Sequence, residues 1–150
     1  METLGDRELL SLETLDQQLA FFGDLPIPVQ ELMLQQTLEE WDDARSQLEE
    51  MIEAWRTDDD TSLLRIAYDG IDEFPDLRAF YDVLVDGRNR SWVPRLIEIL
   101  EDPKRSGTTV VAAVGALHLV GPAGVPSLLR DAGYRVAAPA EGEKEESKSP

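Results

Sequence analysis

The pattern of apolar and polar residues along the chain predicts short extended segments on either side of a long helical region. The apolar stretch at residues 9–12 is typical of a short buried strand. A short helix is predicted over residues 17–22, because Asp16 is a preferred amino-terminal cap and Gly23 is a common helix end. The two prolines within residues 25–28 predict an extended connector, since each disfavours helix in the residue before it.

One long amphipathic helix is predicted over residues 29–56. Large apolar residues recur every seven positions and others lie between them, which gives a single apolar stripe made of Leu34, Leu38, Trp41, Ala44, Leu48, Met51, Ile52 and Trp55. The opposite face is acidic and carries Glu39, Glu40, Asp42, Asp43, Glu49, Glu50 and Glu53. Such a stripe either packs into the core of its own chain or docks a partner helix, and we expect core packing.

Further helices are predicted as far as residue 100. An acidic run ends the long helix and caps a short one over residues 62–68. Residues 74–85 form another helical region, and residues 86–87 are a turn or a helix interruption. Residues 88–100 are helical again, with Trp92 on their apolar side.

The remaining segments predict an α/β fold. Residues 108–114 form a continuous apolar and β-branched run, which is typical of a strand buried on both faces of a parallel sheet. A helix over residues 125–132 and a last strand over residues 134–137 follow, and such a unit is expected to be right-handed and parallel. With the strand at residues 9–12, this predicts a small, mostly parallel sheet of about three strands with a large helical insertion over about residues 28–100.

Charge and composition exclude several classes of partner. The chain has 14 Lys and Arg residues against 31 Asp and Glu residues, and its formal charge of −17 argues against nucleic acid or an anionic membrane as a partner. No apolar run reaches the roughly 18 residues of a transmembrane helix, and no signal peptide begins the chain, so we expect no membrane span and, by default, a cytoplasmic location. There is no cysteine, which excludes disulfides and a cysteine nucleophile. Residues 138–150 are charged and of low complexity, which predicts a disordered acidic tail.

Two residues that could carry chemistry follow predicted strands. Glu13 and His118 each lie just past the carboxyl end of a strand, which is where open α/β sheets bind ligands. If the two strands are neighbours, the carboxylate and the imidazole face one pocket and could bind a divalent metal ion or act as an acid–base pair. The alternative is that His118 is a surface or capping residue and that Glu13 caps a helix or forms a salt bridge.

Arg88, at the start of the helix over residues 88–100, adds a positive charge to this set. It could bind a substrate carboxylate or pair with Glu13, or it could be the solvated end of a helix. Other kinds of site find no support, since the acidic clusters lack the spacing of an EF-hand and the glycines at residues 121–124 do not form a phosphate loop. A single histidine also cannot build a histidine-rich zinc site.

Several segments taken together resemble the TraB/PrgY/GumN family, which is related to the Tiki-type metalloproteases. They occur in the family's order across residues 9–137. The matching pieces are Leu12-Glu13-Thr14 with Gln17-Gln18-Leu19, then Arg88-Asn89 with Trp92, then Val114-Gly115-Ala116-Leu117-His118-Leu119-Val120-Gly121, and last Leu128-Leu129-Arg130-Asp131-Ala132-Gly133-Tyr134.

The resemblance implies a fold and a site. The family's domain is about twice as long, carries two GxxH motifs and conserved glutamates, and is thought to bind a divalent metal ion and cleave peptide bonds. By this resemblance Gly115 and His118 match the second GxxH motif, Glu13 matches a family glutamate and Arg88 matches a family arginine. The first motif is absent, so the resemblance implies that residues 1–137 are the carboxyl-terminal half of a TraB/GumN-like domain.

Two functions are open at this point. The first is a metal-dependent, metalloprotease-like hydrolase that acts on a peptide or protein substrate. In it Glu13 and His118 would be metal ligands or acid–base groups, and Arg88 would position substrate or stabilise negative charge. The second is a non-catalytic, truncated paralogue that binds other proteins through its helical region. The missing first motif leaves enzymatic activity open, and a missing amino-terminal half or a second copy of the chain could complete the site. Family members are often extracytoplasmic.

Overall fold

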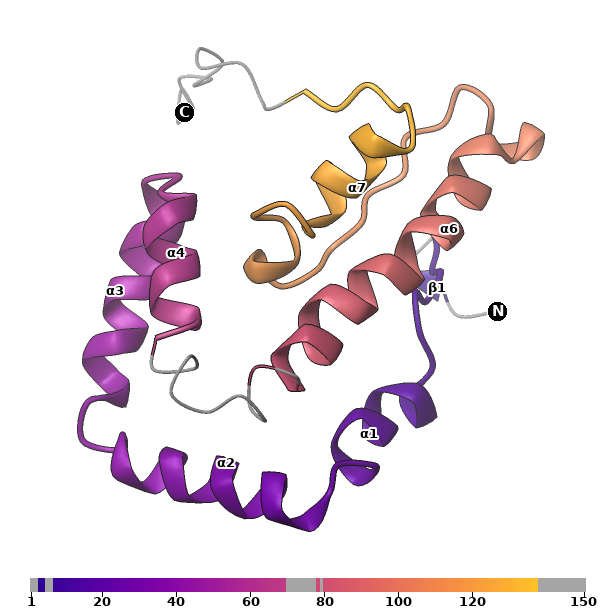
Figure 1. Cartoon of the computed structure of the whole chain (residues 1–150). Coiled ribbons are helices and arrows are strands. Elements are labelled where there is room, and N and C mark those ends of the chain that lie inside the picture. The colour runs from indigo at the N-terminus through magenta and orange to yellow at the C-terminus, as the bar shows by residue number, and fades with distance from the viewer. Residues whose placement is uncertain (1–2, 5–6, 70–77, 79, 138–150) are drawn as a thin grey trace.

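The chain folds into a set of helices built around one central helix. Figure 1 shows a computed structural model, which describes residues 3–4, 7–69, 78 and 80–137. Helix α2 runs from the end of α1 to the pair formed by α3 and α4, and α6 crosses the molecule with α7 beside it (Figure 1). In chain order, the α-helices whose bounds the structure describes are α1 (Leu15–Gly23), α2 (Ile27–Glu39), α3 (Ala44–Arg56), α4 (Asp60–Ala67), α6 (Arg88–Glu101) and α7 (Val125–Asp131).

The central helix α6 carries more of the apolar core than any other element that the structure describes. Its buried residues recur at helical spacing on one face, and the main apolar cluster unites three of them with a residue of α7: Trp92, Val93, Leu96 and Val125. Leu12 and Val114 pack against this cluster from the segments on either side of the helical region. Burying a large apolar side chain contributes about 1.5–3 kcal/mol, so the contact of α6 with α7 is a principal source of stability.

The predicted α/β fold with a parallel sheet is wrong. The only strands in the part of the chain that the structure describes are β1 (Thr3–Leu4) and β2 (Arg7–Glu8), which pair antiparallel. Residues 9–12, 108–114 and 134–137 contain no strand, and no main-chain hydrogen bond joins them to one another. A strand needs a neighbour for its N–H and C=O groups, and an apolar β-branched run supplies side chains for a sheet but not that neighbour.

The single helix predicted over residues 29–56 is two helices, α2 and α3. The break falls at residues 40–43, where the amide of Asp43 donates to the carbonyl of Glu40 in a turn. Three of these four residues are acidic, and like charges close together on a helix are destabilising while Asp is a poor helix former. The apolar periodicity continues through the break, which is why the sequence pattern alone indicates one helix.

The expected core packing of the apolar stripe is also wrong for its heptad residues. Leu34, Trp41, Leu48 and Trp55 are 62%, 70%, 57% and 63% exposed. Helix α3 contacts α4, and Ala54 is its buried residue. Helix α2 buries no residue within the described part of the chain. The stripe therefore lies on the surface of this structure.

The other predicted helices are found, with differences at their ends. Helix α1 is capped by Thr14 rather than Asp16, because Thr14 and Gln17 form a reciprocal capping box. Asp59 caps α4 by accepting from the amide of Ser62.

The region predicted as helical over residues 74–85 is helical wherever the structure describes it, and residues 74–77 and 79 lie outside the described residues. This region continues into the π-helix η2 (Asp82–Gly87), which runs directly into α6. Of the two alternatives predicted for residues 86–87, the turn is wrong, and the π-helical geometry that ends at Gly87 is an interruption of the regular α-helix. The described part of the chain also contains two short 3₁₀ helices between α6 and α7, η3 (Pro103–Arg105) and η4 (Ala116–His118).

Residues 138–150 also lie outside the described part, and the disordered tail stays a prediction. No helix among the described residues is both long enough and apolar enough to cross a membrane.

Candidate functional site

The residues that the sequence singled out meet at the first turns of α6. Arg88 is the first residue of this helix. Glu13 reaches it from the segment before α1, and His118 comes from η4, which follows the extended segment after α6. The three therefore gather around a helix, and not at the edge of a sheet as the predicted fold required.

Glu13 and Arg88 form a two-pronged ion pair between positions 75 residues apart. The Nε atom of Arg88 donates to Oε2 of Glu13 at 3.1 Å, and Nη2 donates to Oε1 at 2.5 Å. The side chains are only 14% and 15% exposed. Charged hydrogen bonds in this paired geometry are among the strongest in proteins, and low exposure reduces their screening by solvent. Of the alternatives that the sequence left open for Arg88, the structure shows pairing with Glu13.

Trp92 joins this ion pair to His118. Its indole Nε1 donates to Oε2 of Glu13 at 3.1 Å, and the guanidinium of Arg88 lies 4.8 Å from the centre of its ring. Arg88 also lies 5.4 Å from the ring centre of Phe21 in α1. The ring centres of Trp92 and His118 are 4.5 Å apart. Glu13, Arg88, Trp92 and His118 thus form one continuous cluster.

His118 is buried, and its hydrogen bond is to a residue that sequence reasoning missed. The imidazole is 9% exposed, and its Nδ1 lies 2.7 Å from Oδ1 of Asn89, which is fully buried. Asn89 precedes Trp92 by three positions and Val93 by four, so it lies on the buried face of α6. A polar residue in the middle of an apolar helical face is the signal that could have identified it.

The charge of His118 is set mainly by burial. Loss of hydration lowers the pKa of the imidazole below its usual 6.5, the positive charge of Arg88 lowers this pKa further, and the negative charge of Glu13 opposes the shift. The ring is therefore neutral at pH 7. Its Nε2 makes no hydrogen bond to any residue that the structure describes.

The described residues do not by themselves make a complete metal site. Both carboxylate oxygens of Glu13 already accept hydrogen bonds from Arg88 and Trp92. No group of three or more histidine, aspartate or glutamate side chains that could hold a metal ion is found in the described ranges. The neutral imidazole of His118 is the one donor in this cluster that suits a divalent metal ion. The metal-binding and catalytic roles of Glu13, Arg88 and His118 stay predictions.

Comparison with known proteins places the chain in a family. The model of the TraB/PrgY/gumN family matches residues 5–138, which is most of the chain and includes every residue of the cluster. The chain belongs to this family. No curated protein and no solved structure matched it.

The lowered pKa of His118 predicts a pH-dependent stability. Below pH 6.5 His118 takes up a proton in the unfolded chain, but in the folded chain its lowered pKa delays this uptake to lower pH. The free energy of unfolding that depends on His118 is therefore fully present above pH 6.5 and is lost as the pH falls toward the folded-state pKa. Urea unfolding between pH 7.5 and pH 5.5 should show a steeper loss of unfolding free energy in the wild type than in His118→Gln, by up to about 1.4 kcal/mol per pH unit. Parallel pH dependences of the two proteins would contradict a neutral, buried His118.

Proposed function

We propose that the chain is the His118-bearing part of a metal-dependent hydrolase of the metalloprotease type, with a peptide or protein as substrate. Family membership supports this proposal at the level of the class. The observation that carries it is the state of His118, a buried and neutral imidazole whose Nε2 atom forms no hydrogen bond with any described residue. Neutral imidazole is the commonest metal ligand and the commonest general base in proteins.

Each residue of the cluster has a separate role in this proposal. His118 would supply one ligand to a divalent metal ion, and the remaining ligands would come from outside the described residues. Such an ion, when bound, polarises a carbonyl and activates water. Glu13 holds Arg88 in place by accepting from its Nε and Nη2 atoms. The Nη1 atom of Arg88 has no hydrogen-bond partner in the described part of the chain, so it is available to a substrate carboxylate or a developing negative charge.

Metal titration with matched variants tests the first part of this proposal. The chain carries 31 acidic residues, so weak binding of Zn²⁺ to surface carboxylates must be separated from binding to His118. We expect calorimetry to show a site whose affinity falls at least about tenfold in His118→Ala, since a ligand is lost. The control Glu49→Gln, which removes an exposed carboxylate of α3, should leave this affinity unchanged.

Equal Zn²⁺ affinity in all three proteins would contradict a site at His118. The hydrolase part is tested by incubating the zinc-loaded protein with a mixture of unstructured peptides and following cleavage by mass spectrometry. Cleavage should be present in the wild type and absent in His118→Ala. Cleavage that is the same in both proteins would contradict a role for His118.

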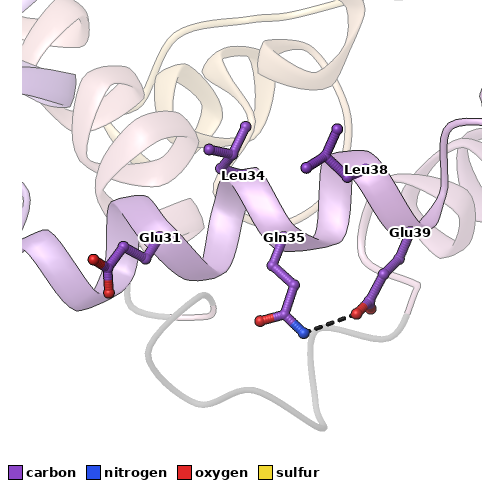
Figure 2. Close-up of a pocket in the computed structure, with 5 residues that line it drawn as sticks. All are labelled: Glu31, Leu34, Gln35, Leu38 and Glu39. Atoms are coloured by element: carbon purple, nitrogen blue, oxygen red, sulfur yellow. Dashed lines mark hydrogen bonds between the residues drawn. The ribbon is translucent and has the colours of Figure 1, made fainter.

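A second candidate function is protein binding through the exposed stripe on α2 and α3. A groove of about 380 Å³ lies along α2. In Figure 2 its two leucines, Leu34 and Leu38, point to one side of the helix, and Glu31, Gln35 and Glu39 lie on the other side. Contiguous exposed apolar surface is a common mark of interaction sites.

Self-association is the form of this binding that can be tested without another protein. Residues 27–56 contain eight acidic and two basic residues, so two copies repel one another unless salt screens their charges. Sedimentation velocity should show a monomer at low salt and a dimer at about 0.5 M NaCl, where the screening length falls to a few Å. Leu34→Ser/Leu38→Ser should abolish the dimer, and Leu19→Ser, an exposed leucine of α1, should not. A monomer at every salt concentration would exclude self-association.

A further inference from the structure

Asn89 is the most deeply buried polar side chain of the described structure, and its environment gives it one specific set of partners. It is the second residue of α6 and has 0% exposure, whereas most asparagines lie at the surface. Burying an amide without hydrogen bonds costs several kcal/mol, so both ends of this side chain need partners. They find them in the segment that contains His118.

The orientation of the amide is fixed by chemistry. Nδ2 of Asn89 lies 2.9 Å from the carbonyl oxygen of Ala123. A carbonyl oxygen can only accept, so the amide nitrogen must face it and the amide oxygen must face His118. That oxygen lies 2.7 Å from Nδ1 of His118 and can also only accept. Nδ1 therefore carries the hydrogen.

This hydrogen bond determines what the other ring nitrogen offers. A neutral imidazole has one N–H, so with the hydrogen on Nδ1 the Nε2 atom has a free lone pair. No buried side-chain nitrogen or oxygen in the described ranges lacks a hydrogen-bond partner. Because Nε2 of His118 makes no hydrogen bond there, it must be accessible to solvent. The imidazole ring of His118 is thus buried except at Nε2, which solvent can reach.

We propose that Asn89 is a positioning residue, which holds His118 as the Nδ1–H tautomer so that the lone pair of Nε2 is directed to an incoming metal ion or proton. The use of this lone pair by a metal rests on the proposed function, but the tautomer does not. In metal-binding histidines, a group that accepts the hydrogen of the other ring nitrogen fixes the orientation and tautomer of the ring. Loss of such a group typically lowers metal affinity 10- to 100-fold. The same side chain binds the carbonyl of Ala123, so it orients the ring and anchors the segment after η4 to α6.

The sequence makes this proposal unusually easy to test, because His118 is the only histidine in the chain. A long-range ¹H–¹⁵N correlation spectrum at pH 8 contains one imidazole spin system. The ¹⁵N shifts distinguish a protonated from an unprotonated ring nitrogen. We expect Nδ1 to be protonated and Nε2 unprotonated in the wild type. A wild-type spectrum with the hydrogen on Nε2 would overturn the proposal without any variant.

Two substitutions separate positioning from a merely structural role. Asn89→Asp keeps an acceptor toward Nδ1 but loses the donor to Ala123, and it should retain the Nδ1–H tautomer. Asn89→Leu has a similar size and no acceptor, and it should give a mixture of tautomers. A role limited to the Ala123 hydrogen bond would make the two variants behave alike, and this result would contradict positioning.

Zn²⁺ titration of the same variants connects the tautomer to the proposed function. Asn89→Leu should bind Zn²⁺ about 10- to 100-fold more weakly than the wild type, and Asn89→Asp should stay close to it. If the wild type has the Nδ1–H tautomer but binds no Zn²⁺ at His118, the proposed metal function fails and the assignment of Asn89 stands. If Zn²⁺ binds His118 equally in all three proteins, positioning by Asn89 is wrong and the metal function stands.

Discussion

The ion pair between Glu13 and Arg88 is the interaction on which the arrangement of this molecule depends. It joins the segment before α1 to the first turn of α6, across 75 positions of sequence, and the indole of Trp92 binds the same carboxylate. Both charges are largely removed from water, so each needs the other, because an unpaired buried charge costs several kcal/mol. Arg88 also stacks on Phe21 and Trp92, which ties α1 to the core cluster.

From this pair the contacts lead directly to the candidate site. Trp92 is at once a core residue, a donor to Glu13 and the ring that packs against His118. Asn89, one residue after Arg88, holds the other side of the imidazole and the carbonyl of Ala123. One turn of helix thus fixes a neutral histidine whose Nε2 is open to solvent. The TraB/PrgY/gumN family match includes all of these residues, and the account proposed for them requires further ligands from outside the described part of the chain.

Sequence reasoning found local structure and side-chain chemistry better than it found topology. The sequence predicted the helix at residues 88–100 and offered the pairing of Arg88 with Glu13 as one alternative, because helical periodicity and charge are properties of the residues themselves. The sheet was wrong because residues 108–114 have strand-like side chains but no partner in the described structure. The break at residues 40–43 was missed because apolar spacing outweighed the local cost of adjacent carboxylates. The partner of Asn89 could not be predicted from its motif alone, but a polar residue on the apolar face of α6 is a signal that it has one.

A double-mutant cycle on Glu13 and Arg88 tests the central claim most directly. Unfolding free energies of Glu13→Gln, Arg88→Met and the double variant should give a coupling energy of about 2 kcal/mol or more, because either single change leaves a buried group without its partner. The exposed pair Arg45–Glu49 serves as the control, and Glu49→Gln with Arg45→Met should couple by less than about 0.5 kcal/mol. A coupling between Glu13 and Arg88 as small as that of the control pair would contradict the account.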